Sequence, residues 1–142
     1  MNVFFDTSSL FKLYHREEGT DALMELFDSA GIEILYLAEI TRVEFSSVVW
    51  KKCRKNEIDE NLAKLLFVKF EKDAEKFTFI KEDSSLKISA QELIGKHWRM
   101  GLRTLDALQL TSALRVKHKI NLFLTADNVL SQIAKIEGFV TQ

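Results

Sequence analysis

The sequence has no proline, a single cysteine, few glycines and no long apolar run. With Cys53 as the only cysteine no internal disulfide can form, which favours a reducing, cytoplasmic setting. No apolar run could span a bilayer, and the N-terminus lacks the charged segment and apolar core of a secretory signal. No linker, repeat or low-complexity tract divides the 142 residues. We therefore expect one domain over residues 1–142, in the cytoplasm and without a membrane anchor.

Short apolar runs alternate with segments of helical period along the chain. Strands are predicted at residues 2–5, 33–37, 77–80, 121–125 and 139–141. Helices are predicted at residues 9–14, 20–29, 41–56, 59–74, 86–97, 104–117 and 128–137, with Thr41 and Asp59 as candidate N-caps. This alternation predicts an α/β fold, a three-layer α/β/α sandwich with a central, mostly parallel sheet of about five strands. In such sheets ligands collect beyond the carboxyl ends of the strands.

Four acidic residues lie in apolar surroundings. Asp6 follows the first strand, Glu44 lies within "TRVEFSSVVW", Asp106 within "LRTLDALQLTSAL", and Asp127 follows the fourth strand. Each has a simple explanation by itself: an N-cap for the first and last, a first-turn anion for Asp106, and an outward-facing side chain for Glu44. All four places converge on one edge of a parallel sheet. We therefore expect the four carboxylates to meet there.

Carboxylates gathered in this way repel one another unless a cation neutralises them. Their oxygens suit hard divalent ions, and no histidine or cysteine joins the set, which favours Mg²⁺ or Mn²⁺ over zinc. Mg²⁺ usually takes one or two carboxylates and completes its shell with water and substrate phosphate. The set thus predicts phosphate-ester chemistry. His15, His97 and His118 are expected at the surface or at an edge of the fold, and no Ser–His–Asp triad is visible.

Four segments carry a family resemblance: "FFDTSSLFKLY", "EITRVEFSSVVWKK", "LRTLDALQLTSAL" and "LFLTADNVLSQIAKIEGF". In this order they resemble the motifs of the PIN-domain ribonucleases, specifically the VapC-type toxins of toxin–antitoxin pairs. The resemblance covers nearly the whole chain. It implies a single PIN-like nuclease domain whose catalytic and metal-binding residues are Asp6, Glu44, Asp106 and Asp127. Ser8 would order the first aspartate, and Thr125 would support the last.

The same resemblance implies a Mg²⁺- or Mn²⁺-dependent endoribonuclease that hydrolyses RNA phosphodiester bonds. As a toxin it would inhibit translation by cleaving a structured RNA. Its partners would be a VapB-like antitoxin and a second copy of the chain in a homodimer. The aromatic residues exceed what one small core needs, so some are candidates for the antitoxin groove or the dimer face, while each one could equally fill the core: Phe11, Tyr14, Trp50, Phe67 and Phe70.

The net charge of −1 argues, taken alone, against a generic nucleic-acid binder. Without the four site carboxylates, however, basic residues are in excess. They cluster at residues 51–55, 96–103 and 115–119. Arg99 and Arg103 are candidates for contacting RNA. For the 51–55 and 115–119 groups we favour solvated helix ends, where cations suit the C-terminal dipole.

Other functions remain open. A PIN nuclease acting in RNA maturation, rather than as a toxin, would share the same chemistry. A receiver-like phosphoacceptor would need paired acids near the first strand and a lysine after the last strand, and neither is visible. A haloacid-dehalogenase-like phosphatase would need a second aspartate two residues after Asp6, where Ser8 stands. A catalytically dead binding module is disfavoured because the acidic set is intact.

Overall fold

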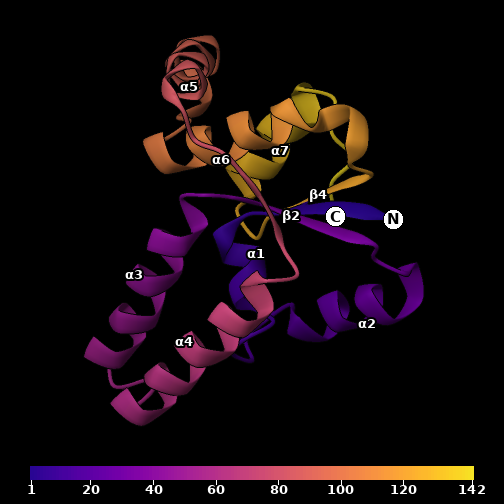
Figure 1. Cartoon of the computed structure of the whole chain (residues 1–142). Helices are drawn as coiled ribbons and strands as arrows, with labels where there is room; N and C mark the ends of the chain where they lie inside the picture. The colour runs from indigo at the N-terminus through magenta and orange to yellow at the C-terminus, as the bar shows by residue number, and fades with distance from the viewer.

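Strands and helices alternate in the computed structural model, which describes residues 1–142 (Figure 1). The strands are β1 (Asn2–Phe5), β2 (Ile34–Ala38), β3 (Thr78–Ile80) and β4 (Leu122–Leu124). The α-helices are α1 (Thr7–Phe11), α2 (Thr20–Ala30), α3 (Thr41–Arg54), α4 (Glu60–Ala74), α5 (Ser84–Lys96), α6 (Thr104–Arg115) and α7 (Asn128–Ile136). Two short 3-10 helices, η1 (Trp98–Met100) and η2 (Lys117–Lys119), flank α6. None of these helices combines the length and apolar character needed to cross a bilayer.

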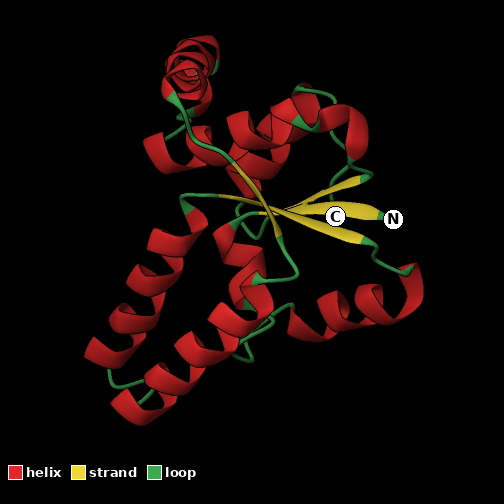
Figure 2. Ribbon diagram, in the orientation of Figure 1, coloured by secondary structure: helices red, strands yellow, loops and turns green.

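The four strands form one parallel sheet in the order β3-β2-β1-β4, with helices on both faces (Figure 2). This confirms the predicted α/β sandwich, with one strand fewer than expected. Residues 139–141 contribute only an isolated parallel bridge between Thr141 and Phe123. The chain turns after α7 at Gly138, whose φ is +89°, and Phe139 then packs its ring on Phe123 at 5.4 Å between centroids. Packing of that side chain takes the place of a fifth strand.

Alternate residues of the central strands enter two separate cores, because successive side chains of a strand point to opposite faces. Phe4 of β1 faces the core under α5, α6 and α7. Val3 and Phe5 face the core under α1, α2, α3 and α4. The sheet is thus apolar on both faces, as a parallel sheet covered by helices requires.

Local sequence predicts the start of α4 correctly but not that of α3, where the expected cap residue is buried in a tertiary contact. Asp59 caps α4 as predicted, since its carboxylate accepts a hydrogen bond of 2.7 Å from the Leu62 N–H. The prediction that Thr41 caps α3 is wrong, because Ile40 holds that position. Thr41 is instead the first helical residue, fully buried, and its hydroxyl accepts a hydrogen bond from Gln109.

The aromatic residues of the second core gather around Phe45 of α3. Its ring stacks on Phe70 at 4.3 Å between centroids, and three further rings surround it, those of Phe11, Tyr14 and Phe67. Phe11 and Phe70 are buried, so of the two roles left open for them they take the one in the core. They build the core that joins α1, α3 and α4.

Phe45→Ala should therefore lower the free energy of unfolding by about 3–5 kcal/mol, because it leaves a large cavity among these rings. Val43→Ala, two residues away but 66% exposed, serves as the control and should change it by less than about 0.5 kcal/mol. Urea unfolding followed by circular dichroism measures both. Equal losses in the two variants would show that the aromatic cluster does not stabilise the fold as described.

Candidate active site

The candidate site lies at the carboxyl edge of the sheet, where β1 and β4 end side by side. From β1 the chain continues to β2 on one side, whereas β4 arrives later on the other side. Open α/β sheets bind ligands at such a change of direction. The Asp6 N–H donates to the Leu124 carbonyl oxygen at 3.0 Å, so strand pairing extends into the first residue beyond β1.

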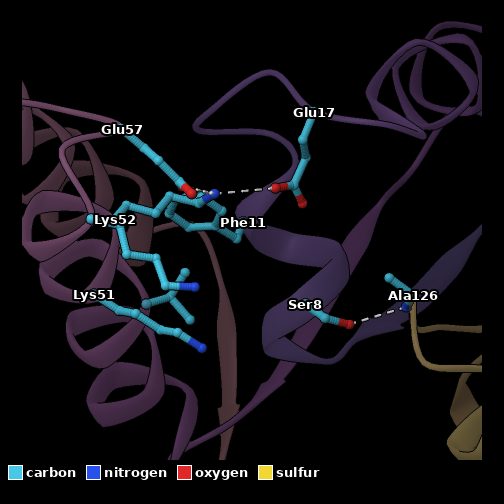
Figure 3. Close-up of a pocket in the computed structure, with 9 residues that line it drawn as sticks. Ser8, Phe11, Glu17, Lys51, Lys52, Glu57 and Ala126 are labelled. Carbon is cyan, nitrogen blue, oxygen red and sulfur yellow. Dashed lines mark hydrogen bonds and ion pairs between the residues drawn. The ribbon is translucent and has the colours of Figure 1, made fainter.

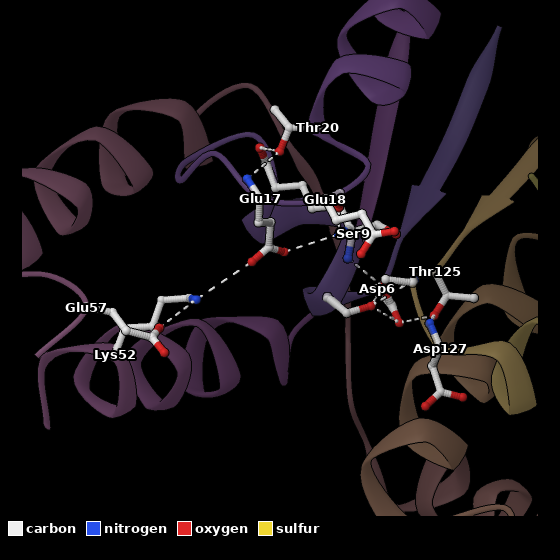
Figure 4. Close-up of polar contacts among 12 residues, drawn as sticks. Asp6, Ser9, Glu17, Glu18, Thr20, Lys52, Glu57, Thr125 and Asp127 are labelled. Atoms are coloured by element: carbon white, nitrogen blue, oxygen red, sulfur yellow. Dashed lines mark hydrogen bonds and ion pairs between the residues drawn. The ribbon is translucent and has the colours of Figure 1, made fainter. Parts of the chain in front are cut away.

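Asp6 is held by donors from two parts of the chain (Figure 4). Its side chain is 4% exposed and accepts hydrogen bonds from the Ser8 hydroxyl at 2.7 Å and the Ser9 N–H at 2.9 Å. The Thr125 hydroxyl, 119 residues away, donates to its other oxygen. Asp6 is therefore the N-cap of α1 and also part of the sheet-edge cluster. Capping α1 and lying at the carboxyl edge of the sheet are thus compatible for this side chain.

Asp127 begins α7, and Thr125 links it to Asp6. The Asp127 N–H donates to the Thr125 hydroxyl oxygen at 3.0 Å, and the Asp127 carboxylate accepts from the Leu130 N–H at 2.7 Å. The second bond makes Asp127 the N-cap of α7. Its side chain remains 35% exposed, so it is open to a ligand.

Glu44 points inward from α3 into a buried polar network. Its Oε1 accepts from the Thr7 hydroxyl at 3.0 Å and from Nε2 of Gln109 at 2.6 Å. The same Nε2 lies 3.1 Å from the Thr7 hydroxyl oxygen and 3.0 Å from that of Thr41, so its two hydrogens are shared among three acceptors. The prospect that Glu44 simply points to solvent is therefore excluded.

Sequence reasoning missed Gln109. Its side chain is 2% exposed, and its Oε1 has no hydrogen-bond partner. The available signal was a long amide side chain three residues after Asp106, in a helix expected to be buried. Such a group requires a hydrogen-bond partner inside the protein.

Asp106 differs from the other three acids because its carboxylate accepts no hydrogen bond within the chain. Its nearest cation is Arg103, whose guanidinium lies 4.0 Å from Asp106 and 4.0 Å from Asp127. Arg103 is 80% exposed, so this contact is weak. Burial raises the pKa of Asp106, and the negative charge of Asp127 adds to this, opposed by Arg103.

The acids form one electrostatic group centred on Asp106. Burial raises the pKa of Asp6 from 3.8 to about 6, against the lowering effect of its hydrogen bonds, and Asp106 raises it further. Burial likewise raises the pKa of Glu44, with Asp106 adding to the effect. Three carboxyl groups are thus harder to ionise than usual. A bound cation would relieve this.

The side chains fit a divalent metal ion but do not form a closed cage for one. No three acidic, histidine or cysteine side chains lie close enough together to bind one ion directly. The donors are nevertheless all hard oxygens, and Asp106 has both of its oxygens free of hydrogen bonds. Because Mg²⁺ needs only one or two carboxylates and keeps several waters, this set suits Mg²⁺ or Mn²⁺.

Of the two arginines predicted to contact RNA, only Arg103 reaches the acids. Arg99 lies over the Trp98 ring at 5.0 Å and makes no contact with them.

The prediction that His97 lies at the surface is wrong. It is 6% exposed, and its Nε2 lies 2.6 Å from Glu137 Oε1, because the end of α5 packs on the segment after α7.

The sequence profile of the PIN domain matches residues 3–136, so the chain belongs to the PIN-domain family. This confirms the resemblance drawn from the four motifs. No curated protein sequence matches the chain.

Solved structures share the fold over nearly its whole length. One is VapC20 from Mycobacterium tuberculosis, described as a sarcin–ricin loop cleaving toxin, with 16% identity, a TM-score of 0.69 and coverage of 97% of this chain and 96% of that one. Another is VapBC2 from Rickettsia felis, bound to a DNA fragment from its promoter, with 14% identity, a TM-score of 0.66 and coverage of 100% and 98%. A third is PAE2754 from Pyrobaculum aerophilum, with 19% identity, a TM-score of 0.63 and coverage of 99% and 92%. At these identities the likeness shows the fold.

Asp6→Asn should stabilise the metal-free protein at pH 7 by about 1–3 kcal/mol, because it removes a buried charge. The folded pKa of Asp6, about 6, lies above the ordinary 3.8, so the native state keeps this proton to higher pH than the unfolded chain. The stability of the metal-free wild type should therefore fall as pH rises from about 4 to about 6, and the variant should show a smaller fall, because Glu44 and Asp106 keep pKa values raised by burial. Thermal unfolding in EDTA across that range measures it.

The control is Asp28→Asn, which replaces an exposed carboxylate on α2 and should keep the wild-type pH profile. Adding MnCl₂ should raise the melting temperature of the wild type and of this control, and not that of Asp6→Asn. A loss of stability in Asp6→Asn at both pH 4.5 and pH 7 would contradict the account of its burial.

Gln109→Leu should destabilise the protein by about 1–3 kcal/mol, because the buried Glu44 carboxylate loses its closest donor. In a Glu44→Ala background the same change should cost at least ~1 kcal/mol less, since that acceptor is already gone. A double-mutant cycle by urea unfolding measures this coupling. Additive effects of the two substitutions would mean that the 2.6 Å contact contributes nothing to stability.

Proposed function

We propose that the chain is a Mg²⁺- or Mn²⁺-dependent endoribonuclease and that residues 1–142 act as a single nuclease domain. The observation that carries the proposal is the buried Asp6 carboxylate beside Asp106 at the carboxyl edge of a PIN-family sheet. Asp6 and Asp106 would hold the ion directly, and Glu44 and Asp127 would complete the site through water. When bound, the ion supplies an activated water and stabilises the departing 3′ oxygen of the RNA.

The remaining residues of the site position these carboxylates. Ser8, Ser9 and Thr125 fix the orientation of Asp6 through hydrogen bonds from two separate segments. Gln109 and Thr7 fix Glu44 in the same way. Held carboxylates need little reorganisation when the substrate arrives, which is the usual source of rate in metal-assisted hydrolysis.

Arg103 is the basic residue best placed to contact RNA. Its exposed guanidinium reaches both Asp106 and Asp127, where a substrate phosphate would bind. Because its contacts with the two acids are long and exposed, the Arg103 guanidinium would be able to turn towards a phosphate oxygen of the RNA. Arg99, which packs on Trp98, has no comparable support.

The biological role we propose is that of a VapC-type toxin acting in the cytoplasm. It would inhibit translation by cleaving a structured RNA, and it would be held inactive by a VapB-like antitoxin and form a homodimer. Similarity of fold to VapC20 and VapBC2 over nearly the whole chain supports this role. A PIN nuclease of RNA maturation is the alternative. A neighbouring gene for a small DNA-binding antitoxin would favour the toxin.

Asp106→Asn should reduce cleavage of RNA by more than ~100-fold, exceeding the 10–100-fold loss typical when only a supporting residue of a metal site is changed. EDTA should abolish cleavage by the wild type, and MnCl₂ or MgCl₂ should restore it. Incubation of purified protein with end-labelled structured RNAs, including a ribosomal stem-loop, measures both effects on denaturing gels.

Asp28→Asn is again the matched control and should cleave at the wild-type rate. Cleavage that persists in EDTA, or full activity in both Asp6→Asn and Asp106→Asn, would overturn the proposed mechanism. Activity should also fall as the pH drops below about 6, since metal ligands must be deprotonated and Asp6 has a raised pKa.

A further inference from the structure

A stripe of side chains runs along one face of α3, beginning at Glu44, one of the four site acids. Glu44, Val48, Lys51 and Lys55 follow one another at intervals of four, three and four residues, which places them on one face of the helix. At 1.5 Å per residue, Lys51 lies about 10 Å along the helix axis from Glu44. The same face of α3 thus carries an acid at its start and two lysines at its end.

Three residues of this stripe, but not Glu44, form one wall of an open cavity of about 310 Å³ (Figure 3). Val48, Lys51 and Lys55 line the α3 side, and Ser8 and Ala126 line the opposite side. The Ala126 N–H donates to the Ser8 hydroxyl oxygen at 3.0 Å, and that hydroxyl donates to Asp6. The wall of the cavity is therefore the same structure that holds the Asp6 carboxylate.

The two lysines of the stripe are free to bind an anion. A third lysine of the cavity, Lys52, is already neutralised, with its Nζ 3.1 Å from Glu57 and 3.7 Å from Glu17. No carboxylate lies within 4 Å of Lys51 or Lys55, and both side chains are exposed. Glu57 lines the same cavity, and its pKa is lowered mainly by Lys52 and to a smaller extent by the charge of Lys55. Unpaired ammonium groups beside a cavity are suited to phosphate oxygens.

The helix dipole alone does not account for this arrangement. Arg54 occupies the same last turn of α3 and would complement the helix end equally well. It lines a different cavity, with Trp50 and Asp59. Arg54 thus faces other surroundings than Lys51 and Lys55, whose cavity includes Ser8, the residue that donates to Asp6.

We propose that Lys51 and Lys55 form a phosphate track, which binds the backbone of a single-stranded RNA segment next to the phosphate that is cleaved. This inference rests on the proposed nuclease function and extends it from the reacting phosphate to its neighbours on the strand. RNA is favoured over an acidic peptide because the cavity shares Ser8 with the site that would hydrolyse a phosphodiester.

The test compares Lys51→Gln/Lys55→Gln with Arg54→Gln and the wild type. Binding of a labelled 12-nucleotide single-stranded RNA is measured by fluorescence anisotropy in EDTA, over a series of salt concentrations. The double variant should bind about 10–30-fold more weakly at 0.1 M salt, with the slope of log K against log[salt] reduced by about 1.4, or about 0.7 for each lost phosphate contact. Arg54→Gln should stay within about twofold of the wild type.

Three results would overturn the phosphate track. One is an equal loss of affinity in Arg54→Gln, which would indicate a general charge effect. Another is displacement of the RNA by inorganic phosphate at submillimolar concentration, which would indicate an isolated anion site. The third is displacement by a glutamate-rich peptide that depends on Lys51 and Lys55, which would assign the cavity to a protein partner.

Failure of this inference can be told apart from failure of the proposed function. RNA binding with the expected lysine dependence, but without cleavage in MnCl₂ or MgCl₂, would overturn the nuclease and leave the track in place. Metal-dependent cleavage with unchanged affinity in the double variant would overturn the track alone. Equal melting temperatures of the variants and the wild type confirm that all are folded.

Discussion

Burial of the Asp6 carboxylate between β1 and β4 is the constraint on which the site depends. Its pKa rises to about 6 because it is almost completely removed from water. Hydrogen bonds from Ser8, Ser9 and Thr125 offset part of this cost and keep the group in one orientation. Because these donors come from both ends of the chain, the carboxylate can be held only when β1 and β4 are paired. Folding and assembly of the site are thus the same event.

Two hydrogen-bond networks hold acids of the site, and Asp106 belongs to neither network. One holds Asp6, and the other holds Glu44 through Gln109 and Thr7. Asp106 has no internal donor, and its charge adds to the burial that raises the pKa of Asp6 and of Glu44. Such an arrangement leaves the Asp106 carboxylate free to bind a cation while its neighbours are fixed. A cation at this position would complete the site, which is why the geometry suits metal-assisted chemistry even without a closed cage.

Much of the fold could be predicted because its signals are local. The strand and helix order, the parallel sheet and the Asp59 cap all follow from hydrophobic period and capping chemistry within a few residues. Local signals misled where a distant segment decided the outcome. Thr41 reads as an N-cap, but it lies buried against Gln109. His97 reads as a surface residue, but it pairs with Glu137, 40 residues away.

The sequence by itself determined the family, the order of strands and helices along the chain and the positions of the four acids, because residue identity and spacing are enough to place side chains on a strand end or a helix face. Only the tertiary structure decided which oxygens are occupied, which carboxylate is free and which lysines face the cavity. These properties depend on loss of water and on donors far away in the chain, such as Thr125 for Asp6. The sequence pattern predicts where a carboxylate lies in the fold, whereas tertiary packing determines its pKa and its hydrogen-bond partners.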